Sequence, residues 1–530
     1  MRSRLALLVS SLTVAVAAPA LWASAQQRRA EDVVTRAAEA LGGAGRLRAV
    51  KTIAVAGYGE TAYMNGGGNI SASVEAPQKW ISVPDYEKII DLEHGRMRVR
   101  QRNHQNFVFA GAAGYLGGAN AASAYLDGDV AYNGAANGRM ARANDQAARA
   151  RRIDMMNNPV ALVRAALDRP AAVSNPRAES SWQLVDITLA TGERLTLAID
   201  PGTGLPAWVR WMAHDENLGD VTFRTTFTGY LPVKGVMLPM GYSTVIDFRS
   251  VVQNKLYVDK NAVDEPVDDL SAPAEVRSAP APRPPAPSPE ATVVSPGVWL
   301  MHGMGGANAI LFEFADHLTM FEAPSSQAWT KALIDRARAT VPAKPLTELV
   351  VSHHHFDHTG GIRQAMAEGL TIVAHKGTEG LFREIALRKG TIAPDALGTT
   401  PKPLKFRAVD DHLQLKDASM QVDLYHVVSN SHMAEGLFAY VPKDRLVVQG
   451  DFFDVGWELY WWQNTYADNI AYRQLQVDTD VPVHGRVLPM TQVLQDIQRM
   501  TKAAADLCAR TQSVGVFAPG CPVKTPARVQ

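Results

Sequence analysis

The segment that most constrains the fold of this chain is residues 346–361, LTELVVSHHHFDHTGG. Apolar and β-branched residues at 349–351 predict a buried strand, which ends at Ser352 in a histidine-rich loop. Such a loop can point several side chains at one spot, and imidazole with carboxylate suits zinc better than calcium or magnesium. A solvated histidine tract is the alternative, but Phe356 and Asp357 interrupt the tract and a glycine pair follows it. The sequence therefore predicts a metal-binding loop.

Further histidines and aspartates follow later apolar stretches. The motifs are His353-x-His355-x-Asp357-His358, Ser431-His432 after 421–428, Gly450-Asp451 after 445–449, and Pro482-Val-His484-Gly485. Together they resemble the HxHxDH signature and the later ligands of the metallo-β-lactamase superfamily, in the same order. Four motifs in register are far more specific than one, and the resemblance covers about residues 291–500.

The resemblance implies an α+β fold, namely a four-layer αββα sandwich, and a centre of two zinc ions. It implies that the first ion is held by His353, His355 and His432, the second by Asp357, His358 and His484, and both by Asp451. Asp357, His358 and Asp451 are also the candidate catalytic residues. Where the family often has an aspartate, the chain has Glu322, which puts one supporting hydrogen bond in doubt.

The expected function is that of a zinc-dependent hydrolase, in which a zinc-bridged hydroxide attacks an ester, thioester, lactone or β-lactam/amide carbonyl. Two alternatives remain open: a mono-iron oxidoreductase of the persulfide dioxygenase type, and a non-catalytic exported binding module. The aromatic residues Trp457, Tyr460 and Trp461 either cover the core or form a wall of the substrate pocket. A small-molecule substrate is expected; oligomeric state is not indicated.

Charge and the N-terminal segment bear on partners and localisation. With 53 basic and 53 acidic residues the net charge is zero, so nucleic acid is not an expected partner. Residues 1–25 resemble a secretory signal peptide, with cleavage expected after Ala25 and a periplasmic or secreted mature chain. The alternative is an uncleaved anchor; no later apolar run is long enough to be a transmembrane helix. For an exported chain, a disulfide between Cys508 and Cys521 is favoured over two free thiols.

Residues 26–270 are expected to form a β-rich accessory domain. Period-two stretches separated by turns predict a curved antiparallel sheet, and residues 111–150, rich in Gly, Ala and Asn, predict a long loop or loose helical insertion. The turn at 200–206 and the segment 219–230 weakly resemble periplasmic lipoprotein-carrier domains. Such a domain either has a hydrophobic cavity that offers apolar substrate to the enzyme or docks it to a partner, or it only packs against the catalytic domain.

Residues 271–290 are expected to link the two domains. Seven prolines lie between 272 and 290, which predicts an extended, semi-rigid spacer. Residues 291–530, the catalytic domain, are therefore expected to bind metal and keep activity on their own. Their pattern predicts strands at 298–301, 309–314, 318–322, 370–374, 404–409, 420–428, 437–441 and 446–449 and helices at 327–340, after Gly360 and around 378–389.

Overall fold

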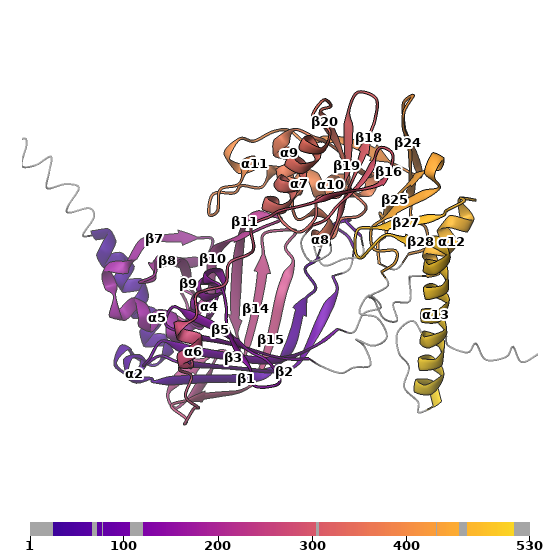
Figure 1. Cartoon of the computed structure of the whole chain (residues 1–530). Coiled ribbons are helices and arrows are strands. Elements are labelled where there is room, and N and C mark those ends of the chain that lie inside the picture. Colours follow the sequence, from indigo (N-terminus) through magenta and orange to yellow (C-terminus); the bar gives the residue numbers. More distant parts are fainter. Residues whose placement is uncertain are drawn as a thin grey trace, which may run out of the picture.

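The computed structural model describes residues 25–65, 71–76, 78–105, 120–303, 307–430, 432–454 and 464–513. Strands of the N-terminal half form one large curved sheet, and the C-terminal half contains two smaller sheets with helices beside them (Figure 1). Within these described residues, none of the helices combines the length and the apolar character that a membrane span requires. The mixed α/β architecture with a β-rich N-terminal half confirms the predicted fold class.

The N-terminal sheet has 13 strands in the order β6-β5-β4-β3-β2-β1-β15-β14-β11-β10-β9-β8-β7, and neighbours are antiparallel. Its strands are β1 (Thr52–Ala62), β2 (Trp80–Asp91), β3 (Arg96–Gln105), β4 (Asn120–Asp127), β5 (Val130–Gly134), β6 (Met140–Arg142), β7 (Val173–Glu179), β8 (Trp182–Thr188), β9 (Arg194–Ile199), β10 (Pro206–Asp215), β11 (Gly219–Thr228), β14 (Gly241–Ile246) and β15 (Val252–Val263). The strands β12 (Leu231–Val233) and β13 (Val236–Leu238) form a separate hairpin. A helix at residues 25–41 packs with α2 (Ala44–Ala49), α4 (Asp145–Met156) and α5 (Pro159–Asp168) on the apolar side chains of the large sheet.

The prediction of a loop or loose insertion at 111–150 is wrong for the described part, residues 120–150. These residues form β4, β5, β6 and the start of α4. The side chains of β4 are mostly small, which hid the strand, but β4 pairs along its length with both β3 and β5. Tyr125 and Tyr132 stack across β4 and β5 with ring centroids 4.7 Å apart, and Asn144 caps α4 by accepting from the Ala147 N–H at 2.8 Å.

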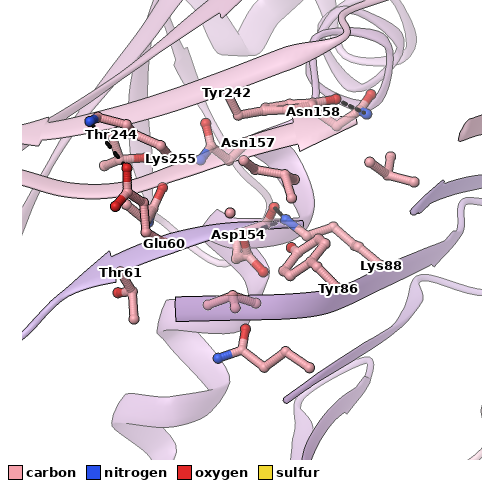
Figure 2. A pocket seen from close by; sticks show the side chains of 16 residues that line it. Glu60, Thr61, Tyr86, Lys88, Asp154, Asn157, Asn158, Tyr242, Thr244 and Lys255 are labelled. Carbon is pink, nitrogen blue, oxygen red and sulfur yellow. Dashed lines mark hydrogen bonds and ion pairs between the residues drawn. The ribbon is translucent and has the colours of Figure 1, made fainter. Parts of the chain in front are cut away.

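The β-rich half encloses a cavity of about 140 Å³ (Figure 2). The lining of this cavity is largely polar. Lys88 Nζ lies 2.5 Å from Asp154 Oδ1, and Asn158 donates to the Tyr242 hydroxyl at 3.3 Å. Burial raises the pKa of Tyr86 to about 12. The buried Lys88 is thus already paired with Asp154, and no lining residue belongs to the predicted metal ligands.

The predicted linker is not extended throughout. Pro273 precedes a short helix, α6 (Ala274–Ser278), and the following residues up to 290 have no regular structure. A proline at a helix N-terminus is tolerated because no backbone N–H is needed there, whereas the six prolines after Ser278 exclude further helix.

The C-terminal half has two sheets. The first, in chain order, contains β16 (Ala291–Ser295), β17 (Val298–Met301), β18 (Ala309–Glu313), β19 (Leu318–Phe321), β20 (Leu346–Val350), β21 (Thr371–His375) and β22 (Lys405–Val409). The second contains β23 (His412–Lys416), β24 (Gln421–His426), β25 (Leu437–Val441), β26 (Leu446–Gln449), β27 (Thr479–Pro482) and β28 (Leu488–Pro489). The principal helices are α7 (Gln327–Thr340), α9 (Ile362–Glu368), α10 (Glu379–Leu387), α12 (Asn464–Tyr472) and α13 (Met490–Ser513).

Because successive side chains of a strand face opposite sides of its sheet, the buried apolar residues of the C-terminal half form three separate clusters. Val350 and Val373 face the second sheet, where they join Leu424 and Val448 in one buried cluster. Their neighbours in the first sheet, such as Leu349, pack instead on α7, α9 and α10. On the far side of the second sheet, apolar residues of α12 and α13 complete a third cluster. Helix, sheet, sheet and helix thus follow one another as four layers.

The two halves share a hydrophobic core. Seven buried residues of the β-rich half belong to the same cluster as α7, α9 and α10: Ala62, Ala72, Leu218, Val221, Ile246, Phe248 and Val251. Polar contacts surround this cluster, and Arg249 donates to Glu384 at 2.8 Å. This packing argues against the separability that was expected from the proline-rich linker.

Candidate metal centre

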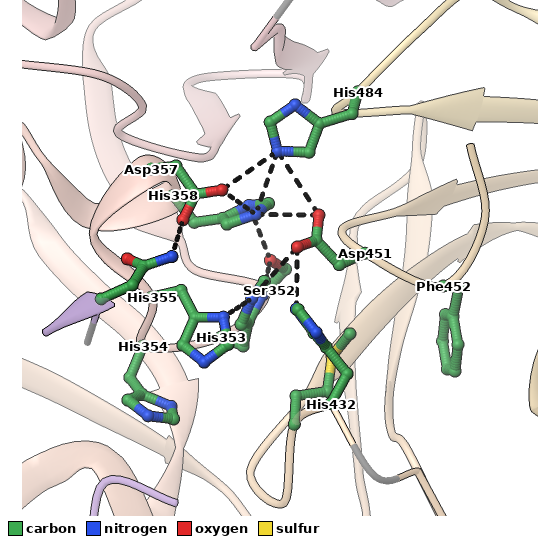
Figure 3. Close-up of polar contacts among 12 residues, drawn as sticks. Ser352, His353, His354, His355, Asp357, His358, His432, Asp451, Phe452 and His484 are labelled. Atoms are coloured by element: carbon green, nitrogen blue, oxygen red, sulfur yellow. Dashed lines mark hydrogen bonds and ion pairs between the residues drawn. The ribbon is translucent and has the colours of Figure 1, made fainter. Parts of the chain in front are cut away.

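Four strand ends bring the predicted ligands together. The loop after β20 carries His353 and His355 and leads into α8 (Phe356–Thr359), and Asp451 follows β26. His432 follows β24, and His484 follows β27. Since β26 and β27 are parallel neighbours, the residues after them emerge at the same edge of their sheet. Figure 3 shows the side chains converging from these separate segments.

The seven residues form two groups in which the candidate ligand atoms all lie within 4.8 Å of one another. The first group is His353, His355, His432 and Asp451, and the second is Asp357, His358, Asp451 and His484. The structure thus brings together all seven residues proposed from the sequence, in the predicted grouping. Their role as metal ligands stays a prediction.

Asp451 belongs to both groups, and its two oxygen atoms face different ones. Oδ2 lies 2.8 Å from His432 Nε2 and 3.7 Å from His353 Nε2. Oδ1 lies 3.0 Å from His358 Nε2 and 3.4 Å from His484 Nε2. A carboxylate placed in this way can bridge two cations, with one oxygen for each.

The two groups differ in their exposure to solvent. Every side chain of the first group is buried. In the second group, by contrast, the side chain of Asp357 is 42% exposed and that of His484 is 17% exposed. In the described part of the chain, the second group is therefore the one nearer to solvent.

Burial and charge set the protonation of the imidazoles. Burial, reinforced by neighbouring imidazoles, holds the pKa of His353 and His355 well below the usual value, and burial also lowers the pKa of His432. At His358 burial opposes the charged form, but Asp451 and Asp357 raise the pKa well above its usual value. The first group therefore offers neutral nitrogen lone pairs, whereas His358 must lose a proton before it can bind a cation.

The donor set fits zinc. Ring nitrogens that belong to different histidines point at one another, with His353 Nε2 only 3.1 Å from His355 Nδ1 and His484 Nε2 only 3.3 Å from His358 Nε2. Without a metal ion, one nitrogen of each pair can donate a proton to the other, and a cation can take the place of that proton. Three imidazoles with one carboxylate, and two imidazoles with two carboxylates, are nitrogen and oxygen sets typical of zinc.

A second layer of side chains holds the ligands. Glu322 Oε1 accepts the Ser352 N–H at 3.0 Å, and its Oε2 lies at ion-pair distance, 3.5 Å, from His358 Nδ1 without a hydrogen bond to it. The Ser352 hydroxyl lies 3.0 Å from His353 Nδ1. A Cβ at Gly450 would stand 2.5 Å from Ser352 Oγ, so only glycine lets the chain before Asp451 pass this close.

Some supporting residues were not found from the sequence. Asn430 accepts the His432 N–H at 2.7 Å, and Asn65 of the β-rich half donates to Asp357 Oδ1 at 2.9 Å. A capping asparagine two residues before His432 is a weak local signal. Nothing in the sequence links Asn65 to a residue 292 positions later.

Other predictions fall beside the centre or outside the described residues. His354 is buried but belongs to neither group and points away from them, as predicted (Figure 3). Trp457, Tyr460 and Trp461 lie outside the described residues, so their contact with substrate stays a prediction. Cys508 is disulfide-bonded near the end of α13, while Cys521, its expected partner, lies outside the described residues.

Several solved structures resemble this chain. A DIM-1 metallo-beta-lactamase exposed to ceftazidime is 16% identical and covers 42% of this chain and 100% of its own, with a TM-score of 0.33. Metallo-beta-lactamases from Pontibacter korlensis and Hirschia baltica are each 15% identical, cover 40% of this chain and 99% and 97% of their own, and have TM-scores of 0.33 and 0.32.

Sequence comparison gives a curated relative and a family. A linear primary-alkylsulfatase from a Pseudomonas species is 31% identical over 75 residues, which is 14% of this chain. The chain spans only 11% of that relative's length. The family model described as the metallo-beta-lactamase superfamily matches residues 302–471, the part of the chain that carries six of the seven clustered residues. Residues 302–471, within the C-terminal half, therefore belong to the metallo-beta-lactamase superfamily.

Proposed function

We propose that this protein is an exported hydrolase with two zinc ions, acting on a small ester, thioester, lactone or β-lactam/amide. The observation that carries this proposal is the position of Asp451 between two groups of imidazoles, with one carboxylate oxygen toward each group. A single-ion centre would not need the second group.

Zinc, when bound, supplies Lewis acidity and makes water nucleophilic near neutral pH. The side chains of this chain orient the reactants around that chemistry. Asp451 offsets the positive charge that both groups would hold, and the buried first group excludes bulk water from one side. Asp357 and His484 border the side through which a carbonyl compound can enter. His358, lying between Asp357 and Asp451, is held by both carboxylates.

Sulfate esters are a second candidate substrate class. The segment of 31% identity to a linear primary-alkylsulfatase supports including them, although the match is confined to 75 residues. A sulfate ester differs from a carboxylic ester in the charge that it brings to the centre. Two closely spaced cations would favour binding of an anionic substrate group.

The test combines metal analysis with a substrate panel. Full-length protein loaded with zinc is expected to hold two ions per chain and to hydrolyse at least one member of a panel of lactam, lactone, thioester and linear alkyl sulfate. His302→Ala is the matched control, because His302 is exposed and belongs to neither group. Absence of metal, or two bound ions without hydrolysis of any panel member, would overturn the proposal.

Metal identity separates the remaining alternatives. A mono-iron oxidoreductase is expected to retain one iron after purification and to consume dioxygen with a persulfide. A non-catalytic module is expected to bind a ligand without turnover. Retention of two zinc ions with hydrolysis contradicts both of these readings.

Export is part of the proposal and rests on the signal-like segment at residues 1–25. N-terminal sequencing of material from the periplasm or medium is expected to begin at Gln26. A chain that keeps Met1 and stays with the membrane fraction would contradict export.

A further inference from the structure

Asn65, Ser71 and Ala72, in the described parts of the connection between β1 and β2, contact the loops of the candidate metal centre. Asn65, in this connection, makes two hydrogen bonds with the loop that carries the first ligands. Its amide nitrogen donates to Asp357 Oδ1 at 2.9 Å, and its amide oxygen accepts the Phe356 N–H at 2.6 Å. The backbone N–H of Phe356 can only donate, so it fixes the orientation of the amide, with the NH2 group toward Asp357.

These bonds determine which oxygen of Asp357 faces the second group. Because Oδ1 accepts from Asn65, Oδ2 is left toward the imidazoles, 3.4 Å from His484 Nε2 and 3.5 Å from His358 Nε2. The side chain of Asp357 is 42% exposed, and Asn65 holds its Oδ1 while the imidazoles contact its Oδ2. Asn65 itself is held by a further hydrogen bond, from its amide nitrogen to the Tyr63 hydroxyl at 3.3 Å.

The same connection also holds the loop that carries His432. The Ser71 hydroxyl donates to Glu435 Oε1 at 2.5 Å, and the Ala72 N–H donates to Glu435 Oε2 at 3.1 Å. Glu435 is only 9% exposed and lies three residues after His432. Arg249 in turn donates to the Ala72 carbonyl at 2.7 Å. One segment of the β-rich half therefore contacts both ligand-bearing loops.

We propose that Asn65 is a positioning residue of the metal centre, and that the β-rich half thereby completes the second metal site. Asn65 acts through Asp357: it presents the carboxylate with Oδ2 toward His358 and His484. This inference rests on the proposed function, since it requires that the second group binds a metal ion. Outer hydrogen-bond partners of ligands typically change metal affinity by about 10- to 100-fold.

The test measures stepwise zinc affinity of the full-length protein by competition with a chelator. Asn65→Ala is expected to weaken binding of one zinc ion about 10-fold or more and to leave the other nearly unchanged. Hydrolysis at limiting zinc is expected to fall through kcat and to recover when zinc is added in excess, with KM for the substrate unchanged. A purely structural defect would not be repaired by excess zinc.

Asn261→Ala is the matched control, because Asn261 also lies in the β-rich half and donates its amide to a carbonyl, that of Pro239, at 3.0 Å. It is expected to keep both zinc affinities, and the metal-free forms of both variants are expected to unfold at similar temperatures. If wild-type protein binds two ions and Asn65→Ala binds them equally tightly, the inference is overturned while the proposed function stands. Wild-type protein that binds no zinc would overturn both.

Discussion

Asp480, on β27, is a fully buried carboxyl group whose protonation is coupled to folding. Burial raises its pKa to about 7, and the Tyr466 hydroxyl lies 2.5 Å from Oδ1. The unfolded chain loses this proton near pH 3.8, so between about pH 4 and 7 the folded state binds more protons. We expect this residue to lower the free energy of unfolding as pH rises through that range, by at most about 4 kcal/mol, and to add no further change above it.

Comparison of wild type with Asp480→Asn in urea at several pH values measures this effect in metal-free protein. The stability of the variant relative to wild type is expected to increase from pH 4 to 7 and then to stay constant. A difference that does not vary with pH would mean that Asp480 is ionised in the folded state.

Asp451 is the residue whose loss should affect both groups at once. Asp451→Ala removes a ligand oxygen from each proposed site and the negative charge that would offset the repulsion between two bound cations. We therefore expect the zinc content to fall to one ion or none and hydrolysis to be lost. His484→Ala is expected to retain one ion, because the first group remains complete. Elemental analysis of both variants would contradict the bridging role if Asp451→Ala still held two zinc ions.

Among the elements, the start of β11 makes a close contact with the C-terminal half. Gly219 has φ +73°, and a Cβ there would stand 2.2 Å from the Lys389 carbonyl oxygen of the catalytic half. The next residue, Asp220, donates its N–H to the same carbonyl at 2.7 Å and accepts the Thr391 N–H at 2.9 Å. A side chain at Gly219 must therefore push the halves apart.

We expect Gly219→Ala to lower the free energy of unfolding by more than the roughly 1–3 kcal/mol that a left-handed residue costs alone. Gly192→Ala is the control, since Gly192 has φ +93° but its Cβ would meet nothing within 4 Å. Urea unfolding of both variants separates the interface contact from backbone strain. Equal losses would show that the contact at Lys389 has no energetic role.

At the scale of elements, the sequence was a good guide wherever apolar periodicity was strong. The helix predicted at 327–340 coincides with α7, and the strand predicted at 349–351 overlaps the end of β20, which begins three residues earlier. Prediction failed at β4, where small side chains gave no period-two pattern and pairing with β3 and β5 forms the strand. Local pattern predicts elements that bury large side chains, and it misses those that depend on their neighbours.

For the whole molecule, the sequence predicted which residues gather at the centre but not what surrounds them. The seven clustered residues follow strands of the catalytic half, so their motifs lie in local sequence. The contacts of Asn65 with Asp357, and of Ser71 and Ala72 with Glu435, join segments about 290 to 360 residues apart. No sequence pattern in either segment predicts its contact with the other. The proline-rich linker suggested independent domains because composition says nothing about the surface that each domain buries.

The shared core makes the last prediction opposite to the one drawn from the linker. Residues 291–530 expressed alone would expose the face of α7, α9 and α10 that packs on Phe248, Val251 and their neighbours. We expect this fragment to bind a hydrophobic dye, to unfold without a cooperative transition and to hold fewer than two zinc ions. Full-length protein cleaved at a protease site inserted between Ala279 and Glu290 is the control, because it loses only chain continuity. The cleaved protein is expected to keep its two halves associated, to unfold in one cooperative transition and to retain two zinc ions. An isolated fragment that unfolds cooperatively and binds two ions tightly would show that the interface with the β-rich half is dispensable.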